Sequence, residues 1–185
     1  MRIRRIIPLL VSAPLALCVA ATATTLERMS VARMTHASQV IVRARCVENS
    51  THWDSGEIWT ITSFEVEEAW KGAPPARILV RLIGGRFGNL TSTVSGVPHF
   101  QPSEEVILFL EPTPRGDFTV VSWMQGTFRI LHDPRSGEEI LTQDTAAFAT
   151  FDPAARRFEF NGIRNLPLAA LRAQVTAAVR KETVK

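Results

Sequence analysis

The stretch that most clearly decides the fold is QVIVRARCV, at residues 39–47. Small apolar residues occupy alternate positions there and share one face: Val40, Val42, Ala44 and Cys46. Arg43 and Arg45 fall on the opposite face. A period of two residues is typical of a β-strand with one buried side. We therefore predict a half-buried strand, with the Cys46 thiol directed into the core as a small hydrophobe.

The same period recurs along most of the chain. It predicts strands at residues 57–69, 78–82, 105–111, 118–124, 127–131 and 140–142, and weaker ones at 90–97 and 158–160. Polar, turn-forming segments separate these strands, including a loop at residues 48–56 and the Pro74-Pro75 pair, which cannot donate to a ladder. The continuous apolar run at 106–110 is typical of a strand covered on both faces, so we expect it to be central.

Helices are expected only near the two ends of the chain. Residues 24–38 fit a short helix or irregular structure, and the sequence leaves open whether Thr24 with Glu27 or Ser30 caps it. A second helix is predicted over about residues 167–181, where apolar residues recur every three to four positions. These features indicate a mainly β protein: a small barrel or sandwich of six to eight short strands with short terminal helices, in which an OB-like arrangement is one option.

Residues 1–23 have the three parts of an export signal: a basic start, an apolar run and small residues before a cleavage site. Ala21 and Ala23 place cleavage after Ala23. The apolar run is shorter than the roughly 20 residues that a membrane span needs, although an uncleaved anchor is the alternative. We expect a single β-rich domain at residues 24–185, with no transmembrane anchor after cleavage, located in the periplasm or outside the cell.

Composition and charge narrow the range of partners. The chain is 45% hydrophobic and 21% charged, which excludes collagen-like and disordered classes. Its net charge is +3, but three of its 21 basic residues lie in the signal segment, and without them basic and acidic residues balance at 18 each. A neutral body gives no electrostatic reason to expect a nucleic-acid partner.

The sequence contains no recognisable motif for a metal, a cofactor or a nucleophile. Its four histidines are scattered through predicted loops and strand ends, and a single mature cysteine excludes thiolate zinc clusters. A site built from His52, Asp54 and Glu57 is a minor alternative to a solvated hairpin tip. We expect no cofactor and no metal. The alternative function is a secreted hydrolase whose site is assembled from distant residues, for example around Cys46 or His99.

The aromatic residues are the most informative candidates for binding. Trp53 is placed in a turn, and Trp59 and Ile61 share the strand face opposite Phe64. Exposed aromatic side chains commonly mark binding surfaces, so we expect these residues to form a ligand platform. The alternative is that the terminal helices cover this face as a second core.

A glycine-rich segment, GGRFG at residues 84–88, supplies the last candidate. Arg86 is predicted at the rim of the ligand platform, where a ligand would approach the backbone closely. The other interpretation is a turn that needs positive φ angles. Trp70 and Trp123 are expected in the core.

Several short motifs resemble those of a recurrent group of exported, β-rich bacterial proteins without an assigned function. They are WDSG at residues 53–56, EEAWKG at 67–72, GGR at 84–86 and PSEE at 102–105. The strand order is also similar to that of OB-type barrels of the netrin-like and metalloproteinase-inhibitor kind. Those barrels carry several disulfides and an amino-terminal cysteine, which this chain lacks, so their inhibitory wedge is not carried over. The resemblance implies a fold and a compartment rather than an activity. Because no catalytic motif is found, our main interpretation is an exported, soluble, non-catalytic module that binds a protein or a small molecule.

Overall fold

The computed structural model describes residues 26–145, 150–152, 156–159 and 162–183. The predicted export signal and its cleavage site lie outside this part of the chain. No helix in the described part combines the length and the apolar composition needed to cross a membrane.

The fold is mainly β, as the sequence predicts, and is built on an eight-stranded sheet with the order β13-β10-β9-β7-β2-β3-β4-β8. Its strands are β2 (Val40–Asp54), β3 (Glu57–Lys71), β4 (Arg77–Ile83), β7 (Glu105–Pro112), β8 (Phe118–Val120), β9 (Thr127–His132), β10 (Glu139–Gln143) and β13 (Leu166–Pro167). β8 pairs with β7 as well as with β4, so five strands close into a ring. The arrangement is therefore compatible with the predicted small barrel.

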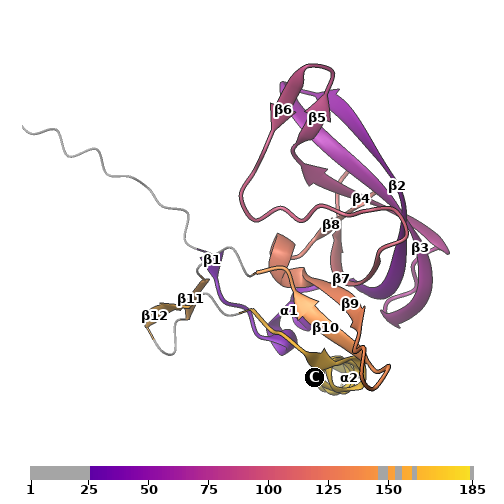
Figure 1. The fold of residues 1–185 in the computed structure, drawn as a ribbon, viewed down its shortest axis with the longest axis vertical. Coiled ribbons are helices and arrows are strands. Elements are labelled where there is room, and N and C mark those ends of the chain that lie inside the picture. Colours follow the sequence, from indigo (N-terminus) through magenta and orange to yellow (C-terminus); the bar gives the residue numbers. More distant parts are fainter. Residues whose placement is uncertain (1–25, 146–149, 153–155, 160–161, 184–185) are drawn as a thin grey trace, which may run out of the picture.

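Two smaller sheets complete the β structure. β5 (Gly85–Phe87) and β6 (Leu90–Ser92) form a hairpin that lies beside the free end of the long β2–β3 hairpin (Figure 1). β1 (Leu26–Glu27), β11 (Thr150–Asp152) and β12 (Arg157–Glu159) form a separate three-stranded sheet. The expected strand at 90–97 is limited to its first three residues, because β5 offers only three partners and the chain turns from Val94 to Val97.

The predicted loop at residues 48–56 is wrong. β2 continues to Asp54 and pairs with β3 along its whole length, with a register shift between Cys46 and Glu48. The reversal takes only Ser55 and Gly56, whose φ angles are 54° and 89°. Positive φ at both central residues is what a tight hairpin turn requires, and its twist matches the strands. The polar composition of this segment reflects an exposed hairpin arm.

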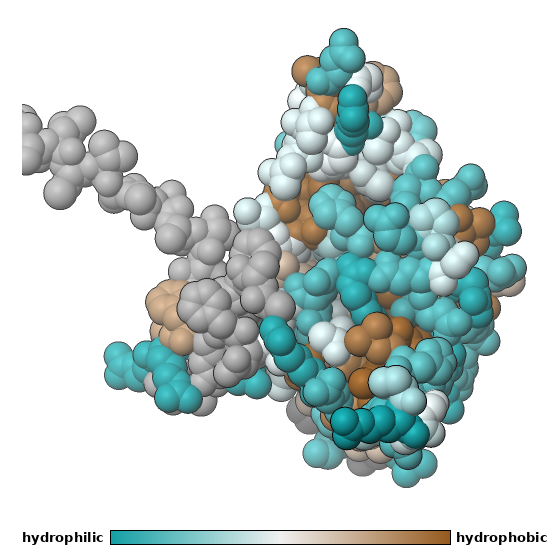
Figure 2. Space-filling view, in the orientation of Figure 1, coloured by the Kyte–Doolittle hydropathy of each residue, from teal (hydrophilic) through white to brown (hydrophobic). Residues whose placement is uncertain are grey.

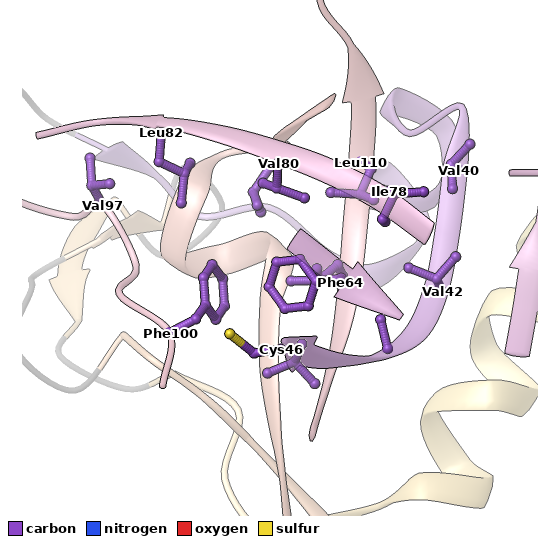
Figure 3. Close-up of a cluster of buried hydrophobic side chains, with 14 residues drawn as sticks. Val40, Val42, Cys46, Phe64, Ile78, Val80, Leu82, Val97, Phe100 and Leu110 are labelled. Atoms are coloured by element: carbon purple, nitrogen blue, oxygen red, sulfur yellow. The ribbon is translucent and has the colours of Figure 1, made fainter. Parts of the chain in front are cut away.

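The main sheet has a hydrophobic core on each of its faces. The first core fills the strand ring: Val40, Val42, Ala44, Cys46, Phe64, Ile78, Val80, Leu82, Val97, Phe100, Val106, Leu108, Leu110 and Val120. Figure 3 shows Cys46 beside Phe64 and Phe100, whose rings meet edge to face at 4.9 Å. The predicted inward direction of Cys46 is confirmed. On the central strand β7, alternate residues enter the two cores, with Ile107 and Phe109 in the second.

Two helices cover the second core. α1 (Val31–Ala37) buries Met34, and α2 (Leu168–Thr183) buries Leu171 and Val175. The Ser30 hydroxyl accepts from the Arg33 amide at 3.2 Å, so Ser30 is the cap of α1. Both helices lie at the end of the molecule opposite the β5–β6 hairpin (Figure 1).

The predicted strand at residues 118–124 ends early. β8 stops at Val120, and residues 123–126 form a short 3-10 helix, η1 (Trp123–Gly126). Ser122 and Trp123 have φ angles of 52° and 50°, in the left-handed region. Two consecutive residues of this kind cannot continue a strand, because the left-handed conformation turns the backbone sharply.

Candidate ligand-binding site

A pocket of about 460 Å³ opens between β4, the turn that joins β7 to β8, and η1. It is lined by Trp59, Arg81, Ile83, Val94, Thr113, Pro114, Arg115, Thr119 and Trp123. We call it the tryptophan pocket, because Trp59 on β3 and Trp123 in η1 line it from segments far apart in sequence. Its volume is within the roughly 300–1,000 Å³ of small-molecule sites, and its combination of apolar walls and a few polar groups is typical of them.

The register of β3 and β4 positions the first part of the pocket. Trp59 pairs with Ile83, and Ile61 pairs with Arg81. Residues diagonal to one another across two strands are close enough for long side chains to touch. The Arg81 guanidinium accordingly lies 5.7 Å from the centre of the Trp59 ring, a cation–π contact.

The buried carboxylate of Asp117 holds the Arg81 side chain in place. Arg81 Nε donates to Asp117 Oδ2 at 2.7 Å, and the Asp117 side chain is only 9% exposed. The Thr113 hydroxyl donates to the other carboxylate oxygen, and the Thr113 amide donates to the Asp117 carbonyl at 2.8 Å. The turn at residues 113–117 is thereby held against β4.

A second ion pair ties the same turn to the β2–β3 hairpin. Arg115 Nη2 lies 2.6 Å from Asp54 Oδ2, and Arg81 Nη1 lies 3.9 Å from the same oxygen. Both arginines line the pocket, whereas Asp54 and Asp117 are outside its lining. The formal charges of these two arginines and two aspartates cancel. The charged side chains in the lining of the pocket are the two arginines.

A hydrogen-bond network around Gln125 holds η1 in place, directly after the left-handed residue Ser122 and including the left-handed residue Trp123. Each such residue costs about 1–2 kcal/mol, so the surroundings must compensate. The side-chain amide of buried Gln125 donates to Ser122 Oγ at 3.0 Å and to the Glu27 carbonyl at 2.9 Å, and the backbone carbonyl of Gln125 accepts from the Gln143 side chain at 2.5 Å. These bonds tie η1, and the Trp123 backbone with it, to β1 and β10.

A neighbouring pocket of about 390 Å³ shares Ile83 and Val94 with the tryptophan pocket. It is lined further by Trp53 and Leu90, which are 49% and 54% exposed. Figure 2 shows apolar residues gathered beneath the tip that β5 and β6 form. The two pockets are therefore adjacent parts of one apolar surface.

The structure brings together some of the predicted site residues and separates others. Trp59 lines the tryptophan pocket and Trp53 lines its neighbour. Ile61 is partly buried opposite Arg81. Arg86 is exposed on β5, where its carbonyl accepts from the Thr51 hydroxyl at 2.7 Å, and it is outside the lining of both pockets. Gly84 and Gly85 have the positive φ angles that the other interpretation required, 100° and 124°, but Gly85–Phe87 form strand β5 rather than a turn.

Helix α2 covers Trp70 rather than Trp59. Arg172 lies 5.2 Å from the Trp70 ring, and Trp70 packs against the second core as expected. The expectation that Trp123 is a core residue is met only in part, because it packs against the first core and also lines the pocket. Sequence reasoning missed Arg81 and Arg115. Their signal was weak: one arginine in an alternating strand, and another in a turn directly after Pro114.

The structure does not bring the residues named for a hydrolase, Cys46 and His99, or those named for a metal site together in one site. Cys46 is buried, and burial raises the pKa of its thiol, which disfavours the nucleophilic thiolate. His99 is exposed, and its carbonyl accepts from Arg129 at 2.9 Å. Asp54 pairs with Arg115, while the His52 ring lies 3.1 Å from Ser50 Oγ. Within the described residues, no three His, Cys, Asp or Glu side chains gather closely enough to hold a metal ion.

No protein-family model matches the chain, and no curated protein matches its sequence. The resemblance to exported bacterial proteins and to netrin-like barrels stays a prediction from sequence.

Proposed function

We propose that this protein is an exported, non-catalytic binding module whose ligand has a flat apolar body and occupies the tryptophan pocket. The observation that carries the proposal is the pairing of Trp59 and Trp123 around a pocket of about 460 Å³. Indole rings offer large, rigid contact surfaces, so they bind flat apolar groups with little loss of side-chain entropy.

The construction of the pocket supports a binding role. Trp59 lies on the sheet against Arg81, and η1, which carries Trp123, is tied to β1 and β10 through Gln125. A pocket formed in advance spares the ligand the cost of ordering its walls. The export part of the proposal rests on the composition of residues 1–23.

The test uses the uncharged probe 1-naphthylacetamide and the indole N–H signals of the isotope-labelled protein. The chain has four tryptophans, so single Trp→Phe variants assign each signal. We expect the Trp59 and Trp123 signals to shift with a Kd of about 1 mM, which corresponds to ~0.3 kcal/mol for each of its ~14 non-hydrogen atoms. The Trp70 signal is the internal control, because Trp70 lies in the second core.

Two variants make the test specific. Trp59→Ala should abolish the shift of the Trp123 signal, because it removes one wall of the pocket. Phe87→Ala removes an aromatic ring that is 44% exposed but lines neither pocket, so the shifts should persist. No shift at Trp59 and Trp123 at millimolar probe, or shifts confined to Trp53 or Trp70, would contradict the proposal.

A further inference from the structure

We propose that the ligand of the tryptophan pocket carries a carboxylate, which the terminal nitrogens of Arg81 bind end-on while the flat apolar body lies between Trp59 and Trp123. This inference rests on the proposed function and adds the chemical class of the ligand. It depends on the hydrogen bonds that Arg81 makes and on those that it leaves unused.

Arg81 is anchored but has donors to spare. Its Nε is used on Asp117, and its side chain is only 14% exposed. Nη1 lies 3.9 Å from the nearest Asp54 oxygen, which is beyond hydrogen-bond distance. In the part of the chain that the structure describes, the hydrogen bonds of this side chain end at Nε. Arg81 therefore lines the pocket while the donors of its terminal nitrogens remain available.

The geometry of a guanidinium selects the kind of acceptor. Two parallel N–H groups on its terminal nitrogens match the two oxygens of a carboxylate, which gives a bidentate pair. Arg81 is held in one orientation by Asp117 on one side and by the Trp59 ring under it. A fixed fork loses little entropy when it binds, so the position of the carboxylate would be well defined.

The charge around the pocket favours a single negative charge. Asp54 and Asp117 already offset the formal charges of Arg115 and Arg81. A monoanion adds one charge to these four groups, whose formal charges cancel, and the charged side chains of the lining, Arg81 and Arg115, are both cationic. A phosphate would bring nearly two charges into a pocket with largely apolar walls, so it would lose more hydration free energy on binding.

The apolar body has a defined path. From Arg81 the walls of the pocket continue through Ile83, Val94 and Pro114 to Trp123. Ile83, Val94 and Pro114 offer no charge and no side-chain hydrogen-bonding group, so the part of the ligand that contacts them must itself be apolar. We therefore assign the ligand class as flat apolar or aromatic carboxylic acids.

The experiment compares three probes that share one ring system: 1-naphthylacetate, 1-naphthylacetamide and 1-naphthyl phosphate. Each is titrated into the purified protein, with the Trp123 indole signal as the readout. A charge-assisted pair is worth about 1.5–3 kcal/mol, so we expect the carboxylate to bind at least ~10-fold more tightly than the amide. The phosphate should bind more weakly than the carboxylate.

Variants locate the preference on Arg81. Arg81→Met should reduce the ratio between carboxylate and amide to less than about twofold. Because that change leaves Asp117 buried without its partner, the double variant Arg81→Met with Asp117→Asn removes both charges and keeps the test valid if the single variant unfolds. Arg77→Met, an exposed arginine on the same strand, is the matched control and should keep the full preference.

The outcomes separate this inference from the proposed function. Equal binding of carboxylate and amide, or a preference that survives in the Arg81 variants, would overturn the carboxylate assignment and leave the tryptophan pocket as a ligand site. Tighter binding of the phosphate than of the carboxylate would overturn the assignment to carboxylic acids in favour of phosphate esters. Failure of all three probes to shift the Trp123 signal would overturn the proposed function itself.

Discussion

Replacing Arg43 by methionine should destabilise the protein by an amount that depends on pH. Arg43 is at the centre of an ion cluster that joins β2 to its neighbours. Its guanidinium lies 3.0 Å from Glu67, 2.7 Å from Glu105 and 2.7 Å from Glu139, and its side chain is 20% exposed. Arg45, at 44% exposed, is the only other arginine in contact with these carboxylates among the described residues.

The magnitude follows from this intermediate burial. Breaking a fully buried ion pair costs about 3–5 kcal/mol, whereas an exposed pair contributes about 0.2–1 kcal/mol. The Arg43 cluster lies between these limits, so Arg43→Met should lower the free energy of unfolding by ~2 kcal/mol at pH 7. For a domain of this size that corresponds to a fall in Tm of roughly 4–8 °C.

The pH dependence has a definite sign. The pKa of Glu105 is below its ordinary value of 4.5, chiefly because Arg43 donates to its carboxylate. A carboxyl group with a lowered pKa stabilises the folded state above pH 4.5, and this contribution is lost as pH falls through the lowered value. The difference between the wild type and Arg43→Met should therefore be full at pH 6–7 and shrink below about pH 4.5.

Urea unfolding at pH 7, 5 and 3.5 measures these differences directly. Arg135→Met, at an exposed turn position, is the control and should leave the free energy of unfolding within about 0.5 kcal/mol of wild type. A deficit below 0.5 kcal/mol for Arg43→Met at pH 7, on the order of an exposed pair, would refute the reasoning. So would a deficit that stays constant down to pH 3.5.

Three further predictions concern the core, the hairpin tip and export. Cys46→Ala should cost roughly 1 kcal/mol in urea unfolding through lost packing, and rapid labelling of the native thiol would contradict its burial. Gly85→Ala should lower Tm, because at φ 124° its Cβ would lie 2.4 Å from Thr60 Oγ1, and an unchanged Tm would argue against that geometry. The exported protein should begin at Thr24 by intact-mass measurement, whereas Met1 to Ala23 retained in a membrane fraction would exclude cleavage.

Local periodicity predicts the strands that bury one face or both. In residues 39–47 the alternation arises because one face fills the strand ring, and in residues 106–110 the continuous apolar run arises because both faces are buried. The pattern fails at residues 48–54, where the hairpin arm is largely exposed and has no buried face to mark it. Composition alone cannot distinguish an exposed strand from a loop, because both are polar.

The site is harder to predict than the fold, because its parts come from different segments. The face of Trp59 follows from the strand period, and that side chain does line the pocket. Trp123 lines the pocket because the backbone turns at two left-handed residues, Ser122 and Trp123. Arg115 lines it because Asp117 and Asp54 hold the turn that carries this arginine. Neither contact leaves a periodic signal. The pairing of Ile61 with Arg81 would place the arginine beside Trp59, but only once the β3–β4 register is known.

The most direct test of the central claim is a crystal structure of the protein grown with 1-naphthylacetate. We predict density for the ring between Trp59 and Trp123, with both carboxylate oxygens within hydrogen-bond distance of the terminal nitrogens of Arg81. Asp117 should keep its bond to Arg81 Nε. A naphthyl ring seated instead beside Trp53 and Leu90, or a carboxylate directed away from Arg81 into solvent, would contradict the account.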